Sequence, residues 1–397
     1  MRRTLFLLLL PFIAEKAATQ SNDQDMRSLI DENLKFAATQ YQLLFRNTPD
    51  TMMPRYFDPA KNKSETSDTK WWCSGFFPGT LLYIYEYTKD SSILQLAEKK
   101  LSILAKEKHF TGNHDLGFMM YCSFGNAYRL TGNPAYKEAV MTAAGSLATR
   151  YRPAIQSIQS WNGGGRLHCP VIIDNMMNLE LLYWVSDQGG DSRYRDIAVT
   201  HSNSTMERHF RPDNSSYHVL DYDLSTGKII QKITWQGAAD SSAWSRGQAW
   251  GLYGFTMMYR FSKNKAYLDQ ARKIAKYLLH HPNLPADKIP YWDFHAPGIP
   301  GTYRDASSAS IIASALLELA QYVKKSDRKE LVATAEKMLR SLASPAYRSA
   351  PGENGGFLIK HSVGSLPHKS EVDVSLTYAD YYFIEALLRY QKWYISK

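Results

Sequence analysis

The feature that most constrains the fold is a helical hairpin that recurs along the chain. Amphipathic stretches with apolar residues at helical spacing are separated by short polar turns, whose residues favour turns and helix N-caps. Five such turns occur, at residues 88–90, 131–133, 189–191, 262–264 and 325–327. A sixth hairpin would combine an N-terminal helix, from about Asp25 to Arg46, with a C-terminal helix, from about Thr377 to Trp393.

Six helical hairpins predict an all-α protein, an (α/α)6 toroid that forms a single domain. The intervals between the turns are uneven, whereas the repeats of a solenoid are more regular. An open helical array is the alternative arrangement. The chain has 397 residues, of which 44% are hydrophobic, and this is enough for one large core.

Longer segments rich in Gly, His, Asp and Trp alternate with the tight turns. They are residues 108–118, 160–175, 211–250, 287–306 and 351–374. In a closed toroid the tight turns and the long segments would gather at opposite ends. Because binding and catalytic residues are concentrated in loops on a rigid scaffold, we expect the functional site at the end with the long segments.

The first 19 residues have the layout of a secretory signal. Two arginines follow Met1, an apolar stretch runs from Leu5 to Ala14, and the small residues Ala17 and Ala18 come next. The apolar stretch is too short to span a bilayer, and no other segment approaches a membrane span. We therefore expect an exported, periplasmic protein whose single domain comprises residues 20–397.

The net charge and the cysteines indicate which classes of ligand the chain is suited to bind. The formal net charge is +9, which favours acidic partners such as acidic sugars. The charges are interspersed, with no run of five basic residues, so nucleic acid is not an expected partner. Cys73, Cys122 and Cys169 do not have the spacing of a zinc site or a disulfide framework. We expect buried thiols with at most one bridge, and no metal or organic cofactor.

Several catalytic motifs are absent. The sequence contains no G-x-S-x-G elbow, no H-E-x-x-H, no phosphate-binding loop and no G-x-G-x-x-G after a strand. These absences argue against a serine hydrolase, a zinc protease of that type, a kinase and a dinucleotide enzyme.

Two aspartates stand beside apolar or aromatic residues. Asp115 lies in His-Asp-Leu-Gly-Phe, where a loop enters a helix, and an ordinary N-cap is the alternative reading. Asp174 lies between two apolar runs, which predicts burial. A buried carboxyl is costly unless it is paired or functional, and burial raises its pKa as a general acid requires.

Residues 234–250 combine stacking and hydrogen-bonding groups. Three tryptophans, two glutamines, an aspartate and Arg246 occur within this segment. Aromatic faces beside polar groups are typical of a sugar subsite, and Arg246 can bind a carboxylate or sulfate through two hydrogen bonds. A tryptophan-rich core loop is the alternative. Two carboxyl groups on either side of one bond suit carbohydrate chemistry.

At these residues the sequence resembles the unsaturated glucuronyl hydrolases, glycoside hydrolase family 88. The resemblance covers about residues 70–390. It is carried by the segments Trp72–Gly79, His114–Phe118, Ile173–Asn178, Ser216–His218, Gln236–Asp240, Trp244–Trp250, Pro290–Phe294 and Tyr378–Phe383. It implies an (α/α)6 barrel that removes a 4,5-unsaturated uronic acid from the non-reducing end of oligosaccharides made by polysaccharide lyases. The C4=C5 bond is hydrated, and the resulting hemiketal opens.

The resemblance also implies a role for each matching residue. Asp174 would be the acid/base, and Asp115 would be its partner. His218 and Gln236 would position substrate and water. Trp72, Trp161 and Trp250 would form the aromatic walls on which the sugar stacks. Arg246 would be a polar contact to the substrate.

Three functions are compatible with the sequence. The first is a hydrolase of glycosaminoglycan fragments, in which Ser365, His368 and Lys369 would sense sulfate. The second is an unsaturated rhamnogalacturonyl hydrolase acting on pectin fragments. The third is a non-catalytic protein that binds uronate oligosaccharides. The sequence does not determine the preferred linkage, the sulfation or the oligomeric state.

Overall fold

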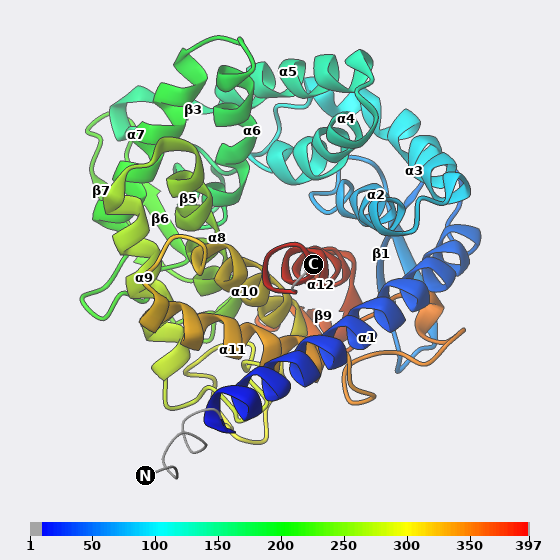
Figure 1. Ribbon diagram of the computed structural model, residues 1–397. Helices are drawn as coiled ribbons and strands as arrows, with labels where there is room; N and C mark the ends of the chain where they lie inside the picture. The colour runs from blue at the N-terminus through cyan, green and yellow to red at the C-terminus, as the bar shows by residue number, and fades with distance from the viewer. Residues whose placement is uncertain (1–9, 396–397) are drawn as a thin grey trace, which may run out of the picture.

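The helices fall into two groups according to how much of their surface is buried. A computed structural model describes residues 10–395 (Figure 1). The inner group is buried along most of its length, and every residue of α10 is buried. Its members are α2 (Phe76–Thr88), η2 (Gly117–Gly125) continued by α4 (Asn126–Thr131), α6 (Asn175–Asp187), α8 (Ser245–Ser262), α10 (Ala306–Leu319) and α12 (Thr377–Tyr394).

The outer helices bury one face only. In α9 the buried positions Tyr267, Ala271, Ile274 and Leu278 follow a spacing of three or four residues, so a single stripe faces the inner layer. The outer group is α1 (Leu10–Arg46), α3 (Ser91–Leu104), α5 (Pro134–Ala148), α7 (Arg193–Arg208), α9 (Lys265–His280) and α11 (Lys325–Leu342).

The inner helices form a closed ring. Each one contacts the next along the chain, and α12 contacts α2, which closes the circle. The outer helices pack against them in hairpins, and α1 contacts both α2 and α12. The predicted (α/α)6 toroid is therefore confirmed, and the open array is excluded.

The tight turns owe their geometry to local caps. The side chains of Asp90, Asn133 and Asn264 accept hydrogen bonds from the backbone N–H two residues later, at 2.8, 3.0 and 3.0 Å, as N-caps do. One predicted turn is misplaced. Residues 325–327 form the first turn of α11, and the connection from α10 consists of residues 320–324, because Lys324 rather than Asp327 occupies the N-cap.

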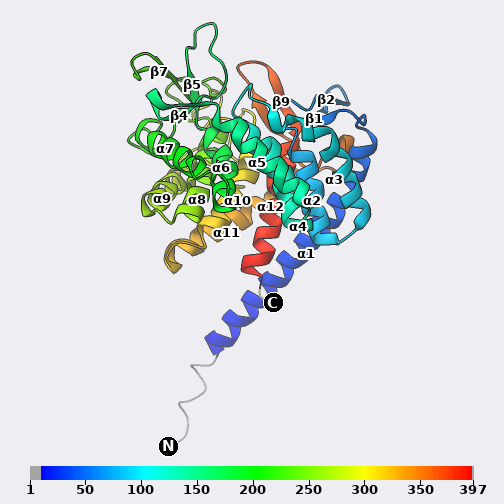
Figure 2. The same cartoon turned by 90° about the horizontal axis from the view of Figure 1, so that it is seen from above.

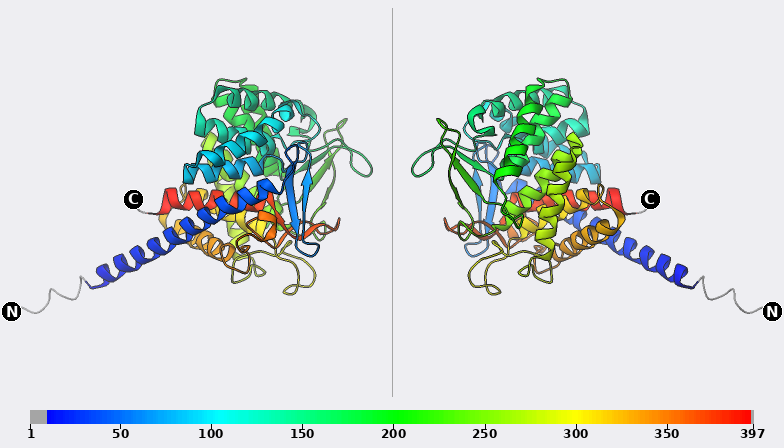
Figure 3. Two further views of the ribbon diagram at one scale, coloured as in Figure 1. Left: turned by 90° about the vertical axis from the view of Figure 1, so that its right-hand side faces the viewer. Right: turned by 90° about the vertical axis from the view of Figure 1, so that its left-hand side faces the viewer.

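Residues 10–395 also contain three small antiparallel sheets, in connections between the helices, and the sequence did not predict them. The strands are β1 (Met53–Asp58), β2 (Lys63–Ser67), β3 (Tyr151–Arg152), β4 (Ser157–Ile158), β5 (Pro170–Ile172), β6 (Val219–Tyr222), β7 (Ile229–Ile233), β8 (Ser362–Ser365) and β9 (Ser370–Leu376). The sheet orders are β2-β1-β9-β8, β3-β4 and β5-β6-β7. The strands gather at one end of the helical ring (Figure 2), opposite the start of α1 and the end of α12 (Figure 3).

The cysteines and the lengths of the helices can be compared with the sequence predictions. Cys73, Cys122 and Cys169 are free thiols, and the first and third are buried. Within residues 10–395, none of the helices has both the length and the apolar character needed to cross a bilayer. Residues 1–9 of the predicted signal lie outside the described residues, and residues 10–19 belong to α1.

Candidate active site

The candidate residues lie where inner helices begin, at the end of the ring that carries the strands. Asp115 comes two residues before η2, Asp174 directly precedes α6, and Arg246 lies in the first turn of α8. Helix N-termini carry partial positive charge, because their first N–H groups have no partner within the helix. Several inner helices begin at this end of the ring, and their N-termini together favour an anionic ligand there.

Asp174 is a largely buried carboxyl group with spare hydrogen-bonding capacity. Its side chain is 11% exposed. The residue occupies the N-cap position of α6, but its side chain makes no capping hydrogen bond, and its Oδ2 atom makes no hydrogen bond within the described residues. Burial raises the pKa of Asp174 to about 7, although the positive charge of Arg246 opposes the shift. The group therefore gains and loses its proton near neutral pH, as a general acid and base must.

Asp115 is similarly enclosed, with a side chain 13% exposed. Burial, and then the negative charge of Asp174, raise the pKa of Asp115 to about 8, and the charge of Arg150 opposes this. The two carboxyl groups influence each other, so they titrate as a pair. The N-cap of the following helix is Leu116 rather than Asp115, so the N-cap alternative is wrong.

His218 is held in one tautomer beside Asp174. Its Nδ1 atom accepts hydrogen bonds from the backbone N–H groups of Trp235 and Gln236, at 3.1 and 3.2 Å. Burial lowers the pKa of His218 well below its usual range, so the ring is neutral and its hydrogen is on Nε2. That atom lies 3.8 Å from Oδ2 of Asp174. The ring also stacks against Trp244, with centroids 4.4 Å apart.

Gln236 and Arg246 both hold strand β8. Nε2 of Gln236 donates to the carbonyl of Gly364 at 2.9 Å. Arg246 donates to the same carbonyl, to that of Val363, and to Asp305 Oδ2 at 3.2 Å. The predicted role of Arg246 was a polar substrate contact. Because this residue is only 1% exposed, the structure places it behind the site surface, where it supports β8 and supplies positive charge.

The predicted aromatic walls differ in exposure. Trp72 and Trp161 are half-buried, and Trp72 packs against Tyr378 with ring centroids 4.9 Å apart. Trp250 is fully buried, between Phe118 and Tyr382. It therefore lies in the wall of the site rather than on its surface.

The sequence did not single out two residues near the carboxyl pair, Trp235 within segment 234–250 and Asp305. Trp235 lies 6.3 Å from Trp161 and 5.3 Å from His368 between ring centroids, and so extends the aromatic surface. Asp305 caps α10 through Ser307 and also binds Arg246. The sequence Asp-Ala-Ser-Ser at 305–308 is an N-cap signal that could have located it. Within residues 10–395, no group of three or more His, Cys, Asp or Glu is arranged to hold a metal ion.

The sequence model of glycosyl hydrolase family 88 matches residues 46–394. This chain belongs to glycosyl hydrolase family 88. It is thus a glycoside hydrolase, and its two carboxyl groups lie at the expected end of the toroid.

Relatives within family 88 match nearly the whole chain. An unsaturated glucuronyl hydrolase of Formosa agariphila is 42% identical over 85% of this chain and 84% of its own length. An unsaturated chondroitin disaccharide hydrolase of Streptococcus pyogenes is 34% identical over 83% and 84%. A crystal structure of an unsaturated glucuronyl hydrolase specific for heparin superimposes with a TM-score of 0.89 at 43% identity, and covers 92% of this chain and 97% of its own.

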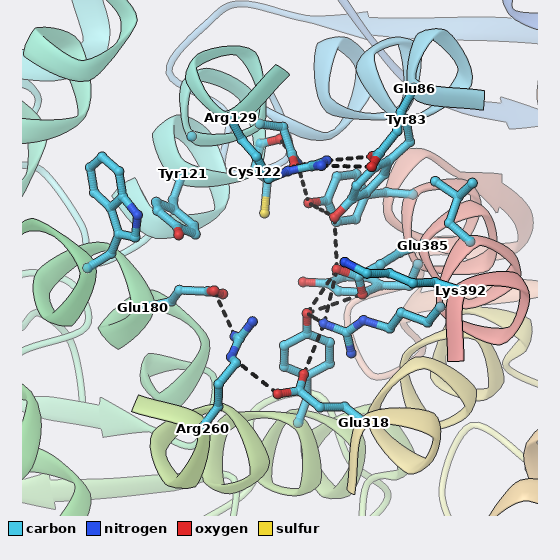
Figure 4. A pocket seen from close by; sticks show the side chains of 18 of the residues that line it. Tyr83, Glu86, Tyr121, Cys122, Arg129, Glu180, Arg260, Glu318, Glu385 and Lys392 are labelled. Atoms are coloured by element: carbon cyan, nitrogen blue, oxygen red, sulfur yellow. Dashed lines mark hydrogen bonds and ion pairs between the residues drawn. The ribbon is translucent and has the colours of Figure 1, made fainter. Parts of the chain in front are cut away.

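The family 88 ring also encloses a second cavity, which extends from the far ends of the inner helices, at Gln188 and Lys392, to Gly117 and Met177 near their starts. It measures about 870 Å³ and is surrounded by carboxylates and arginines (Figure 4). Arg260 pairs with Glu180 and Glu318, at 2.7 and 3.2 Å, and Arg389 pairs with Glu318 at 3.1 Å. Arginines suit the partial negative charge of helix C-termini. Glu180 and Glu318 thus each have an arginine partner within hydrogen-bond distance, unlike Asp174.

Proposed function

We propose that this family 88 hydrolase removes a 4,5-unsaturated uronic acid from the non-reducing end of oligosaccharides released by polysaccharide lyases. The observation that carries the proposal is the state of Asp174, a buried carboxyl group with an unused oxygen and a pKa raised to about 7. The names of the relatives support the choice of an unsaturated glucuronyl substrate.

The reaction begins with proton transfer from Asp174 to C4 of the substrate. The C4=C5 bond is part of an enol ether, so protonation at C4 leaves positive charge at C5, shared with the ring oxygen. The carboxylate of Asp174 is then close to the Nε2–H of neutral His218, which stabilises the negative charge. Water adds to C5 and returns a proton to Asp174. The product is a hemiketal, which opens and releases the next sugar.

The charge of the site suits this substrate. A uronic acid is an anion at neutral pH, and the inner-helix N-termini favour an anion at this mouth. The net charge of +9 raises the rate of encounter with acidic oligosaccharides.

Within this class we propose glycosaminoglycan fragments as the natural substrates. Two of the relatives named above support this: one is named as specific for heparin and the other as an unsaturated chondroitin disaccharide hydrolase. In this chain Oγ of Ser365 lies 2.7 Å from Nδ1 of His368, and His368 stacks on Trp235. These side chains are candidates for contact with the leaving sugar and its sulfate groups. No comparable observation favours pectin fragments.

The proposal is tested by the ultraviolet absorbance of the C4=C5 bond, which is conjugated with the carboxylate. Unsaturated disaccharides from chondroitin, hyaluronan and heparin, and unsaturated rhamnogalacturonan fragments, are each incubated with the wild-type chain. Loss of absorbance supports hydration, and the order of the rates identifies the substrate. If absorbance persists on all of them while the sugars still bind, the chain is a binding protein.

We also propose that the protein is exported to the periplasm. The charged, apolar and small-residue order of residues 1–19 supports this. Mass spectrometry of the protein from the periplasmic fraction should find an N-terminus near residue 20. A protein that retains Met1 and stays in the cytoplasm would contradict the proposal.

A further inference from the structure

Two residues next to the catalytic carboxyls contact each other. His114 directly precedes Asp115, and Asn175 directly follows Asp174. Nδ1 of His114 is hydrogen-bonded to Oδ1 of Asn175, and both residues are buried. The contact joins the loop before η2 to the first residue of α6.

The orientation of the Asn175 amide is fixed by its other partners. Its Nδ2 atom donates to the carbonyl of Ile158 and to Oγ of Ser160, both at 2.9 Å. A carbonyl oxygen only accepts, so the atom facing Ile158 must be the nitrogen. The oxygen of Asn175 therefore faces His114, and the hydrogen between them belongs to Nδ1 of His114.

The second nitrogen of His114 is consequently an acceptor. Burial lowers the pKa of His114 to about 3, and the charge of Arg150 acts in the same direction. A neutral ring with its hydrogen on Nδ1 has a lone pair on Nε2, and this atom lies 3.3 Å from Oδ1 of Asp115. A lone pair on Nε2 and a negatively charged oxygen at this distance repel each other, and protonation of Asp115 removes this repulsion.

The charged groups around Asp115 are Asp174 and Arg150. Asp174 favours a neutral Asp115, and Arg150 favours the carboxylate. The Arg150 guanidinium donates to the carbonyls of Gln159 and Thr111, at 2.8 and 2.6 Å, and no hydrogen bond joins it to Asp115 in the described residues. Arg150 thus acts on Asp115 only through space, whereas Nε2 of His114 lies 3.3 Å from the carboxyl oxygen.

We propose that His114 and Asn175 are positioning residues that hold a proton on Asp115, so that Asp174 alone exchanges a proton in each turnover. The two histidines of the site then have opposite tautomers. His114 presents a lone pair to Asp115, and His218 presents an N–H to Asp174. This inference rests on the proposed function for its catalytic meaning, but the tautomers themselves do not depend on any substrate.

The tautomers are tested by nitrogen NMR of the full chain with 15N-labelled histidine, without substrate, between pH 6 and 8. We expect His114 to show a protonated Nδ1 and a bare Nε2, and His218 to show the reverse. The signals are assigned by their loss in His114→Gln and His218→Gln. An imidazolium at His114, or a hydrogen on its Nε2, would overturn the proposal. This result is independent of whether the chain hydrates unsaturated uronates.

Asn175→Asp provides a second test if a histidine variant does not fold. A carboxylate at this position would draw a proton onto His114, turn its Nε2 into a donor and leave Asp115 ionised. We expect the Nε2 signal to become that of a protonated nitrogen, and kcat to fall about tenfold with a smaller change in KM.

Asn178→Asp is the matched control for that substitution. Asn178 is a buried asparagine in the same helix, and its Oδ1 accepts from the N–H of Phe118 instead of His114. The bare Nε2 of His114 should persist in this variant. Protonation of Nε2 in both variants would show that added charge, rather than the Asn175 contact, sets the tautomer, and would refute the proposal.

Discussion

Nε2 of His218 lies 3.8 Å from Oδ2 of Asp174, and neither atom makes a hydrogen bond within residues 10–395. Both atoms are buried, and a buried polar atom without a partner costs free energy. A movement that brings the Nε2–H within hydrogen-bond distance of Oδ2 would satisfy both atoms.

Asp174→Asn should abolish turnover while leaving the fold intact. The amide cannot donate an acidic proton to C4 or accept one from water, so kcat should fall by about 10³-fold or more. Absorbance of an unsaturated disaccharide measures turnover, and calorimetry measures binding. We expect substrate affinity to change little, and the melting temperature to change little near pH 4, where the carboxyl group of Asp174 is protonated. Retained turnover would assign the acid to another residue.

The pH dependence should show an alkaline limb near neutrality. Asp174 must be protonated to act as an acid, and its pKa is raised to about 7 by burial. Activity should therefore fall as the pH rises through about 7, with the limb broadened by the coupled group Asp115.

The raised pKa of Asp174 also affects the stability of the fold. The unfolded carboxyl ionises near pH 4, so between about pH 4 and 7 the folded state binds more protons, and this contribution to stability decreases as pH rises. The Asp174→Asn variant should lack this part of the pH dependence of its melting temperature.

Arg246→Met should destabilise the protein as well as reduce activity. The substitution leaves the buried carboxylate of Asp305 and the carbonyl groups of β8 without their cation. Removal of one partner from a buried ion pair costs about 3–5 kcal/mol. Urea denaturation measures the loss, and the double variant Arg246→Met, Asp305→Asn should recover part of it. A single variant as stable as the wild type would show that the ion pair does not support this region.

Glu180→Gln should leave catalysis unchanged. Glu180 lies in α6, like Asn178, but its carboxylate pairs with Arg260 and lines the second cavity of the ring. Burial raises the pKa of Glu180, and Arg260 retains its contact with Glu318 in the variant. We expect kcat and KM within about twofold of the wild type. A large loss of kcat would mean that the second cavity is coupled to the catalytic pair.

Asp380→Asn tests a buried carboxyl group with no catalytic role. Its oxygens accept from the N–H groups of Leu358 and Ile359 and from the hydroxyl of Tyr41. An amide nitrogen would face one of these donors, which leaves a buried group unsatisfied and costs about 1–3 kcal/mol. Thermal unfolding should show the loss, while kcat of the folded enzyme should match the wild type. Reduced kcat at full stability would contradict this reading.

The parts of the structure that depend on neighbouring residues were predictable from sequence. Asp90, Asn133 and Asn264 cap helices through the N–H groups two residues later, so the order of residues is enough to locate the turns. The apolar runs on both sides of Asp174 likewise predict burial, and burial alone raises its pKa. The hairpins, the toroid and the two carboxyl groups follow from signals of this kind, with the family resemblance selecting the reaction.

The tertiary structure decided the features that depend on residues far apart in the chain. Strand β1 pairs with β9, Arg246 binds Asp305 and the backbone of β8, and the tautomer of His114 depends on Asn175, which Ile158 and Ser160 orient in turn. A hydrogen bond has its energy only where donor and acceptor meet at about 3 Å. The sequence thus determined which groups capable of acid–base chemistry are present, and the closure of the ring determined which of them meet and which nitrogen or oxygen carries each proton.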